Sequence, residues 1–401
     1  MGTPLIWKSF QLHNFMFGYM YPTLLYMNPK DRVITTRTLN WKMIPWLTIG
    51  VFGVAFVGIP PLIYIFIREA YFPRGTTSMI KISIYICLLV CNVLPLGLST
   101  LPLFATDYVP AFNDILKWNK CLEKDFPELA NLVAKEDERR PDLIGMFLCL
   151  TVVVTASSPL AVTFAAVVLN LDQFDYVIED ILPEPMERET VEHILIPFFV
   201  RFVLVFSIGL EGLRTLSMSF TLTATYVYVI THGLRILGKI TSPTQFFFRY
   251  TQIRMANLMI RGTLGYISAL FIAAGQVSTV VLLWMTVNGY DHAPSFILFL
   301  MFPVLALIVM AFTIIMFQQS IAIFERSHEL VENWKIGCTS RTSGKGTYEL
   351  KINREIKKVG IAQRPIVMTI GGLRVIKRGF QIEYLSLLMD NFTNAVLVIK
   401  V

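Results

Sequence analysis

The chain has 401 residues, of which 54% are hydrophobic and 16% are charged, and its formal net charge at pH 7 is +7. An ordinary soluble domain has about 25% charged residues, so this composition excludes a typical water-soluble protein. The charged residues are also clustered, and the long windows between the clusters contain almost none. Such windows are typical of a protein that crosses a membrane several times.

Five of these windows predict transmembrane helices, because each exceeds the roughly 20 apolar residues that a helix needs to cross a bilayer. Two further segments also predict spans, although the first carries Arg201, Glu211 and Arg214 and the second carries Glu383 and Asp390. In chain order, the predicted spans cover residues 43–67, 82–106, 143–169, 194–230, 263–287, 293–324 and 382–399. We therefore expect an all-α, polytopic membrane protein, a single domain over residues 1–401 with seven transmembrane helices.

The connecting segments alternate in their content of Lys and Arg, which are retained on the cytoplasmic side of a membrane. Residues 1–42 contain five Lys or Arg, and residues 235–262 contain five and no acid. Residues 172–193, in contrast, contain one Arg beside eight Asp or Glu. We therefore predict a cytoplasmic N-terminal segment, an extracellular C-terminus and a location in the plasma membrane. The basic excess lies in the inner segments, where it can contact anionic lipid, so no nucleic-acid partner is expected.

The segment between the second and third spans has a pattern of its own. From Pro110 to Arg140, apolar residues recur among charged ones, which predicts an amphipathic cytoplasmic helix. Pro127 lies inside this segment and is expected to interrupt the helix. We expect a flexible loop after Thr339, and no separate soluble domain.

Several function classes are disfavoured by what the chain lacks. G-protein-coupled receptors have the opposite orientation, and no repeat relates the prolines in the spans as a two-part transporter would require. Neither HExxH nor GxSxG occurs, no span holds a pair of Asp residues, and the five His residues are scattered. We therefore expect no enzyme activity, no metal and no cofactor. A membrane transporter, or a seven-span receptor or scaffold that is not a channel, remains an alternative.

The end of the chain carries the most specific signal. Thr393 and Asn394 precede five apolar residues, Ala395 to Ile399, and Lys400 and Val401 follow. This tail, the inverted seven-span layout and the short last helix resemble the insect-type chemoreceptor family, the arthropod gustatory and odorant receptors. Gustatory members often end with Thr-Tyr, five apolar residues, Gln and Phe, so the spacing matches although three residues differ. The stretch from Arg364 to Phe380 also resembles divergent chemoreceptor-like proteins of other hexapods.

The resemblance implies a fold and an activity. In that family four subunits, identical or not, surround one pore, and each contributes its seventh helix to the lining. A small-molecule tastant or odorant binds in the outer half of each subunit, among helices two to six. The implied activity is a ligand-gated, weakly selective cation channel.

For the pore, the resemblance implies a lining by the last helix. The candidates are Asp390, Asn394, Val396, Leu397 and Lys400. Val396 and Leu397 are the expected gate, because a narrow apolar ring stops hydrated ions. Four copies of Lys400 at the mouth would repel cations unless the side chain extends into water away from the axis. Without the resemblance, the same pattern is typical of a helix that packs or faces lipid.

For the ligand pocket, the expected wall residues lie in the outer halves of the spans. They are Tyr85, Thr163, Phe198, Arg201, Phe202, Trp284, Phe296 and Phe299. Arg201 is expected to pair with an acid of the preceding loop, such as Glu192, or to meet an acceptor group of a ligand. Glu211 and Arg214 are three residues apart and are expected to satisfy each other on one helix face.

Overall fold

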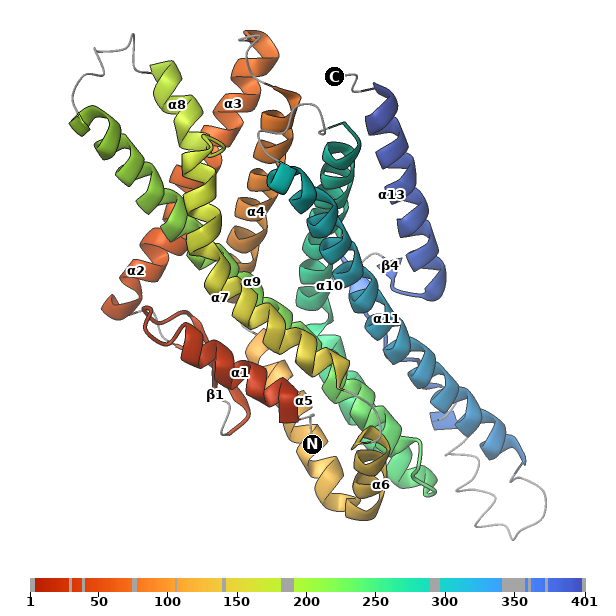
Figure 1. Ribbon diagram of the computed structural model, residues 1–401. Helices are drawn as coiled ribbons and strands as arrows, with labels where there is room; N and C mark the ends of the chain where they lie inside the picture. The colour runs from red at the N-terminus through yellow and green to blue at the C-terminus, as the bar shows by residue number, and fades with distance from the viewer. Residues whose placement is uncertain are drawn as a thin grey trace.

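The computed structural model describes most of the chain (Figure 1). The described residues are 4–28, 31–37, 40–73, 78–104, 107–138, 142–181, 191–288, 296–340, 358–359, 362–371 and 374–398. Lys400 and the segment 341–357 lie outside these ranges. The helices are α1 (Pro4–Met16), α2 (Ile44–Trp46), η2 (Leu47–Gly58), α3 (Ile59–Tyr71), α4 (Met79–Phe104), α5 (Tyr108–Asp125), α6 (Pro127–Glu138), α7 (Leu143–Val168), α8 (Gln173–Ile181), α9 (Val191–Leu237), α10 (Pro243–Asn288), α11 (Phe296–Ser340) and α13 (Arg378–Val398).

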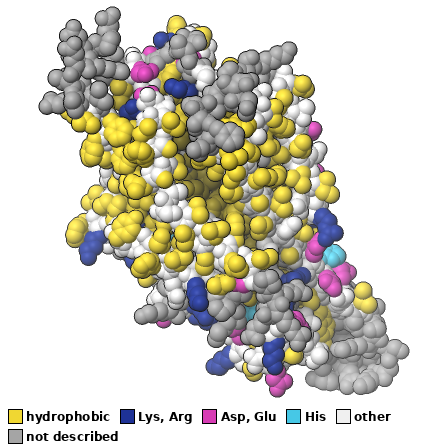
Figure 2. Space-filling view, in the orientation of Figure 1, with side chains coloured by type: hydrophobic (Ala, Val, Ile, Leu, Met, Phe, Trp, Pro, Cys, Tyr) yellow, Lys and Arg dark blue, Asp and Glu magenta, His cyan; other side chains and the backbone are white. Residues whose placement is uncertain are grey.

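The helical class and the membrane character predicted from the sequence are confirmed. Within the described ranges, six helices are long and apolar enough to cross a membrane: Trp41–Tyr71, Met79–Thr100, Leu143–Asp180, Leu195–Leu237, Pro243–Asn288 and Phe299–Ile336. Hydrophobic side chains form a wide band across the middle of the molecule, and charged side chains gather toward its two ends (Figure 2). α13, which corresponds to the seventh predicted span, has 21 residues but is more polar than these six helices. The seventh crossing and the orientation of the termini therefore remain predictions.

Three helices are longer than the spans predicted for them. α9, α10 and α11 have 47, 46 and 45 residues, or about 70 Å each, against a hydrocarbon core of about 30 Å. These helices therefore extend beyond the predicted spans 194–230, 263–287 and 293–324, whose limits in the membrane remain predictions. The predicted connecting segment 235–262 is largely helical, because α10 begins at Pro243.

The inner part of α10 is a helix because one of its faces is buried. Phe246, Tyr250 and Ile253 recur at intervals of three or four residues and are fully buried. They belong to the largest core of the molecule, which α1, α5 and the inner part of α9 also build. Arg249 lies beside this face and pairs with Asp125 at the end of α5. Charged residues in this predicted connecting segment therefore mark the exposed edge of a helix.

The amphipathic segment before α7 forms two helices, as predicted. α5 ends at Asp125 and α6 begins at Pro127, so the break falls at the predicted proline. The Trp118 ring of α5 packs against α9, and its Nε1 donates to the carbonyl of Arg249 at 3.0 Å. Gly233 of α9 makes this approach possible, since an added Cβ would lie 2.3 Å from the Trp118 ring.

The first long helix has an unusual middle. Residues Leu47–Gly58 form a π-helix between α2 and α3. Two of its glycines lie against neighbouring helices: a Cβ on Gly50 would lie 2.9 Å from Glu211 Cγ, and one on Gly58 would lie 2.8 Å from Asn92 Oδ1. These close approaches seat the first helix against α9 and α4.

The N-terminal segment packs against α9. Arg214 donates through Nη1 to Glu211 at 3.3 Å and through Nη2 to the carbonyl of Tyr21 at 2.8 Å. The Tyr21 hydroxyl donates at 3.1 Å to Glu211 Oε2, the same oxygen that accepts from Arg214. The predicted pairing of Glu211 with Arg214 is therefore present, and it includes a partner from outside the helix.

Two short antiparallel hairpins, which the sequence analysis did not anticipate, complete the fold. β1 (Leu25–Asn28) pairs with β2 (Val33–Thr36), with Leu25 opposite Thr36. β3 (Thr369–Ile370) pairs with β4 (Arg374–Val375) just before α13. α13 lies along α10 and α11, and its C-terminal end is at the same end of the molecule as α3 and α8, opposite the end where α1, α5 and α6 gather (Figure 1).

Candidate functional site

The C-terminal end of α7, the start of α8 and the first part of α9 meet at a tight turn, on the side of the membrane that is predicted to be outer. Asn170 adopts a left-handed conformation, with φ of 52°, and the Leu171 amide donates to the carbonyl of Ala166 at 2.8 Å. Asn tolerates this conformation better than most residues, so it suits the end of a helix. The Asp172 side chain then accepts from the amides of Phe174 and Asp175, at 3.0 and 3.1 Å, and caps α8.

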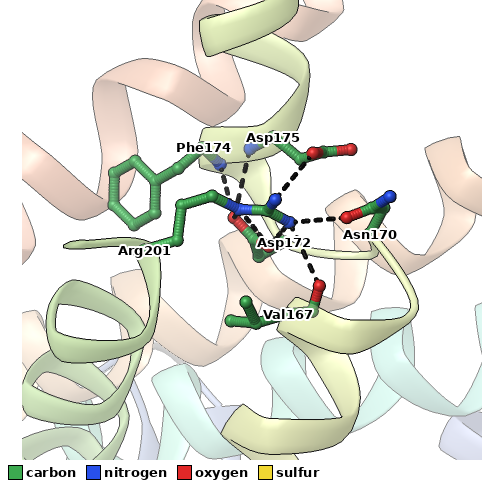
Figure 3. Close-up of polar contacts among 6 residues, drawn as sticks. All are labelled: Val167, Asn170, Asp172, Phe174, Asp175 and Arg201. Atoms are coloured by element: carbon green, nitrogen blue, oxygen red, sulfur yellow. Dashed lines mark hydrogen bonds and ion pairs between the residues drawn. The ribbon is translucent and has the colours of Figure 1, made fainter. Parts of the chain in front are cut away.

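Arg201 of α9 fills the centre of this turn (Figure 3). Its Nε and Nη2 donate to Asp172 Oδ2, at 3.1 and 2.5 Å. Nη1 lies 2.8 Å from Asp175 Oδ1, and Nη2 also reaches Asn170 Oδ1 at 3.0 Å and the Val167 carbonyl at 3.3 Å. The guanidinium therefore has a partner on each of its nitrogens.

The charges of this group are largely removed from solvent. Arg201 is 8% exposed and Asp172 is 1% exposed. A buried charge is costly unless it is paired and hydrogen-bonded, and each of these is. The expected acidic partner is therefore present in the loop after α7, at Asp172 and Asp175; the side chain of Glu192 lies outside the described residues.

A second outer group surrounds Tyr85 of α4. Its ring meets that of Tyr176 of α8 edge to face, with centroids 6.4 Å apart, in a buried cluster with Leu62 and Ile65 of α3. The Tyr176 hydroxyl donates to Glu69. Tyr85 is thus placed where α3, α4 and α8 join.

A third outer group connects α4, α10 and α11 to the final helix. Its buried members are Ile80, Leu282, Trp284, Met285, Phe302 and Ala306. Phe299 packs against this cluster, and so do Ala395 and Val396 of α13. Trp284 is 2% exposed, and its Nε1 has no acceptor within the described part of the chain. The outer cluster, as we call this group, thus holds an unused hydrogen-bond donor beside α13.

The other expected pocket residues lie apart from this cluster. Thr163 is buried in α7, whereas Phe198 is half-buried on α9. Phe202 stacks on Phe206, with ring centroids 6.0 Å apart, and the side chain of Phe296 lies outside the described residues. The expected pocket residues therefore fall into separate outer groups, of which only the outer cluster reaches α13.

The final helix presents a stripe of exposed side chains. Glu383, Leu387, Asp390, Asn394 and Leu397 recur every three or four residues, so they share one face, and all are exposed. Leu397 is 66% exposed, while its neighbour Val396 packs into the outer cluster. Glu383 pairs with Arg374 at 2.5 Å. The two expected gate residues therefore face in different directions.

Three cavities lie among residues that the sequence analysis did not select. The first is lined by α9, α10 and α11, including Phe271, Phe312 and Phe317. The second lies between the N-terminal segment and α9, beside His13 and Arg214. Burial, with the nearby Arg214 charge, lowers the pKa of His13 to about 4, so this side chain is neutral near pH 7.

The third cavity is the largest, at about 200 Å³, and lies between α7, α9 and α11. Ser and Thr residues within the predicted spans are a weak sequence signal for a cavity, because many of their hydroxyl groups donate to a backbone carbonyl of their own helix. Thr223 of the first cavity, for example, donates to the Ser219 carbonyl at 2.9 Å. In the described part of the chain, no three His, Cys, Asp or Glu side chains come together as a metal site.

Comparison with known proteins identifies the fold. No protein-family model matches the chain, and no curated protein matches it. Among solved structures, the insect olfactory receptor OR5 from Machilis hrabei in complex with eugenol superposes with a TM-score of 0.57, at 11% identity over 98% of both chains. A second structure of that receptor gives a TM-score of 0.53, at 11% identity over 98% of this chain and 97% of the other. The chain therefore has the insect chemoreceptor fold, as its layout and tail predicted.

Proposed function

We propose that this protein is a chemosensory receptor that acts as a ligand-gated, weakly selective cation channel in the plasma membrane. The full-length likeness to an insect olfactory receptor supports this, and that receptor was solved with a small odorant, eugenol. The six apolar helices make the protein a multi-pass membrane protein. Its ligand would be a small tastant or odorant.

The observation that carries this proposal is the outer cluster. It brings Trp284 and Phe299, two of the expected pocket residues, into the same packing unit as Val396 of α13. A small apolar molecule with a hydrogen-bond acceptor would satisfy Trp284 Nε1, which is otherwise unpaired in the described chain. By spreading the cluster, the molecule would move the outer end of α13 directly.

The pore, in this proposal, is lined by the exposed stripe of α13. Leu397 is the gate residue that faces the axis, and Val396 transmits the motion of the pocket. Asp390 and Asn394 sit deeper on the same face, where an ionisable side chain is best explained by water. We assign Arg201 to holding the outer turn on α9, because its nitrogens are already engaged.

Assembly into a homotetramer or heterotetramer would give the stripe its partners. A further surface supports association. Phe248, Met255 and Met259 lie along one face of the inner part of α10, beyond the predicted span, and all are more than half exposed. Apolar side chains that line up in this way outside the bilayer are typical of a protein–protein interface.

Patch-clamp recording from cells that express the protein tests the proposal. A panel of volatile and tastant molecules, including eugenol, should evoke a cation current in the wild type. Trp284→Phe keeps the ring but removes the donor, so the half-maximal concentration of an activating ligand with an acceptor should rise about tenfold, the cost of one hydrogen bond. Leu397→Ser should raise the current without ligand, because a hydroxyl hydrates the constriction.

Trp41→Phe is the matched control, since Trp41 is 75% exposed and is the first residue of the first apolar helix, outside the outer cluster. It should leave both the response and the surface level unchanged. Surface-expressed protein that takes up solute without any ligand-gated current would instead favour a transporter. A Leu397→Ser variant with wild-type basal current would exclude this face of α13 from the constriction.

A further inference from the structure

The largest of the three cavities lies on the side of the membrane region that is predicted to be inner, far along α11 from the outer cluster. Leu143 and Phe147 of α7, Phe220 of α9, and Met316, Gln318 and Gln319 of α11 are among its lining residues. We call it the inner cavity. Gln318 lies roughly 33 Å along the helix axis from Phe296, about the thickness of the hydrocarbon core, and Leu143 is the first residue of α7. The inner cavity is thus at the cytoplasmic interface of the bilayer.

The walls and the polar groups of the inner cavity are chemically distinct. Aromatic and aliphatic side chains form most of the lining, and none of the lining residues carries a charge. Gln318 and Gln319 supply the only amides of that lining, and no hydrogen bond joins either side chain to another described residue. A primary amide both donates and accepts, so this pair suits an uncharged head group with a hydroxyl or carbonyl.

We propose that the inner cavity binds one uncharged, single-chain amphiphile from the bilayer, with its hydroxyl or ester head at Gln318 and Gln319. Its hydrocarbon chain lies among Phe147, Phe220 and Met316, where it is removed from water and lipid alike. About 200 Å³ accommodates part of one chain but not a complete two-chain lipid. The absence of Lys and Arg from the lining disfavours a phosphate or carboxylate head.

The inner cavity is connected to the final helix through a thin aromatic wall. Phe312 and Met316 line both this cavity and the first cavity. Phe312 meets Phe220 with ring centroids 4.1 Å apart, and Phe317, on the other side, meets Tyr384 of α13 at 5.0 Å. An occupant that displaces Phe312 or Met316 therefore changes the surface against which α13 packs.

Photolabelling of the purified protein in phosphatidylcholine nanodiscs tests the site. The probes are a diazirine-bearing monoacylglycerol, the fatty acid of the same chain and the matching alkane. The monoacylglycerol should label peptides of α7 and α11 about tenfold more than the alkane does, the factor expected for one hydrogen bond. Ala224→Leu fills the inner cavity from α9 and should abolish that labelling, whereas Ala311→Leu, on an exposed position of α11 outside the lining, should preserve it.

A double variant, Gln318→Leu with Gln319→Leu, removes both amides but keeps the size of the cavity. It tests the proposal independently if Ala224→Leu does not fold. It should label equally with monoacylglycerol and alkane. Equal labelling by these two probes in the wild type would overturn the proposal, and so would labelling by the fatty acid that matches or exceeds that by the monoacylglycerol. Because the measurement is binding, its outcome does not depend on whether the protein conducts ions.

Discussion

Arg201 shows how one side chain can hold three helices together. It sits on α9, and its partners come from the end of α7 and the start of α8. Removing the cation would leave Asp172 and Asp175 close together without a counter-charge. Loss of one member of a buried ion pair costs about 3–5 kcal/mol, far more than loss of a surface pair.

Arg201→Gln should therefore lower thermal stability in detergent by an amount that corresponds to about 3–5 kcal/mol, and should reduce surface expression. Arg235→Gln is the control, because Arg235 pairs with the exposed Glu136 at the surface, and its effect should be small. Unfolding followed by intrinsic fluorescence measures both. If the Arg201→Gln protein is stable and only its ligand response is shifted, the result would support a role for Arg201 in ligand binding and contradict the structural role.

The type of partner that Arg201 has could be predicted from the sequence, but not its identity. An Arg in a span needs an acid or an acceptor, and the loop after α7 is rich in acids. Which acid it meets depends on the turn formed by the left-handed Asn170 and by Asp172, which caps α8. Hydropathy treats all the acids of this segment alike, so it cannot predict which of them the turn places beside Arg201. The contact of the outer cluster with Val396 could not be predicted either, because it joins segments that are far apart in the chain.

At the scale of the elements, the hydropathy windows predicted the six apolar helices of the described chain but not the ends of the longest ones. Charged residues ended the predicted spans, yet beyond the bilayer a helix can expose them to water while its other face stays buried. α10 does so, with Arg249 paired to Asp125 and Tyr250 in the core. The packing of α5 against α9 is one contact that holds this inner region together.

Gly233→Ala tests that packing. The new Cβ would lie 2.3 Å from the Trp118 ring, so overpacking should destabilise the protein by about 1–3 kcal/mol. Gly209→Ala, in the same helix, meets nothing within 4 Å and should gain up to about 1 kcal/mol from helix propensity. Thermal unfolding of the two variants should shift in opposite directions; equal shifts would show that Trp118 yields without cost.

At the scale of the whole molecule, two exposed faces bear on the proposed assembly of several chains. Glu383 of the α13 stripe pairs with Arg374, but the other residues of the stripe and the apolar face of α10 are exposed in the described part of a single chain. Helices that are polar on a face within the membrane region require water or another protein surface there. Association of several copies would supply both, with a central conduit and a cytoplasmic contact.

Met255→Glu should weaken this association, because a carboxylate would be placed in the centre of the apolar face of α10. The mass of the purified particle, measured by light scattering or mass photometry, should fall from that of an oligomer toward that of a single chain. Leu132→Glu on α6 is the control, since Leu132 is also about half exposed but lies away from that face. An oligomer that tolerates Met255→Glu would place the subunit contact elsewhere.

Part of the protein core borders water and part borders lipid, and the stability of these two parts should depend differently on temperature. The large core around Phe112, Tyr226 and Phe246 includes α5 and the part of α10 before its predicted span, so opening it there exposes apolar surface to water and raises the heat capacity. Separating the spans in lipid exchanges one apolar contact for another, and involves no such hydration. Cooling therefore weakens this end of the protein more than the membrane-embedded part, and it is at this end that cold should first loosen the structure.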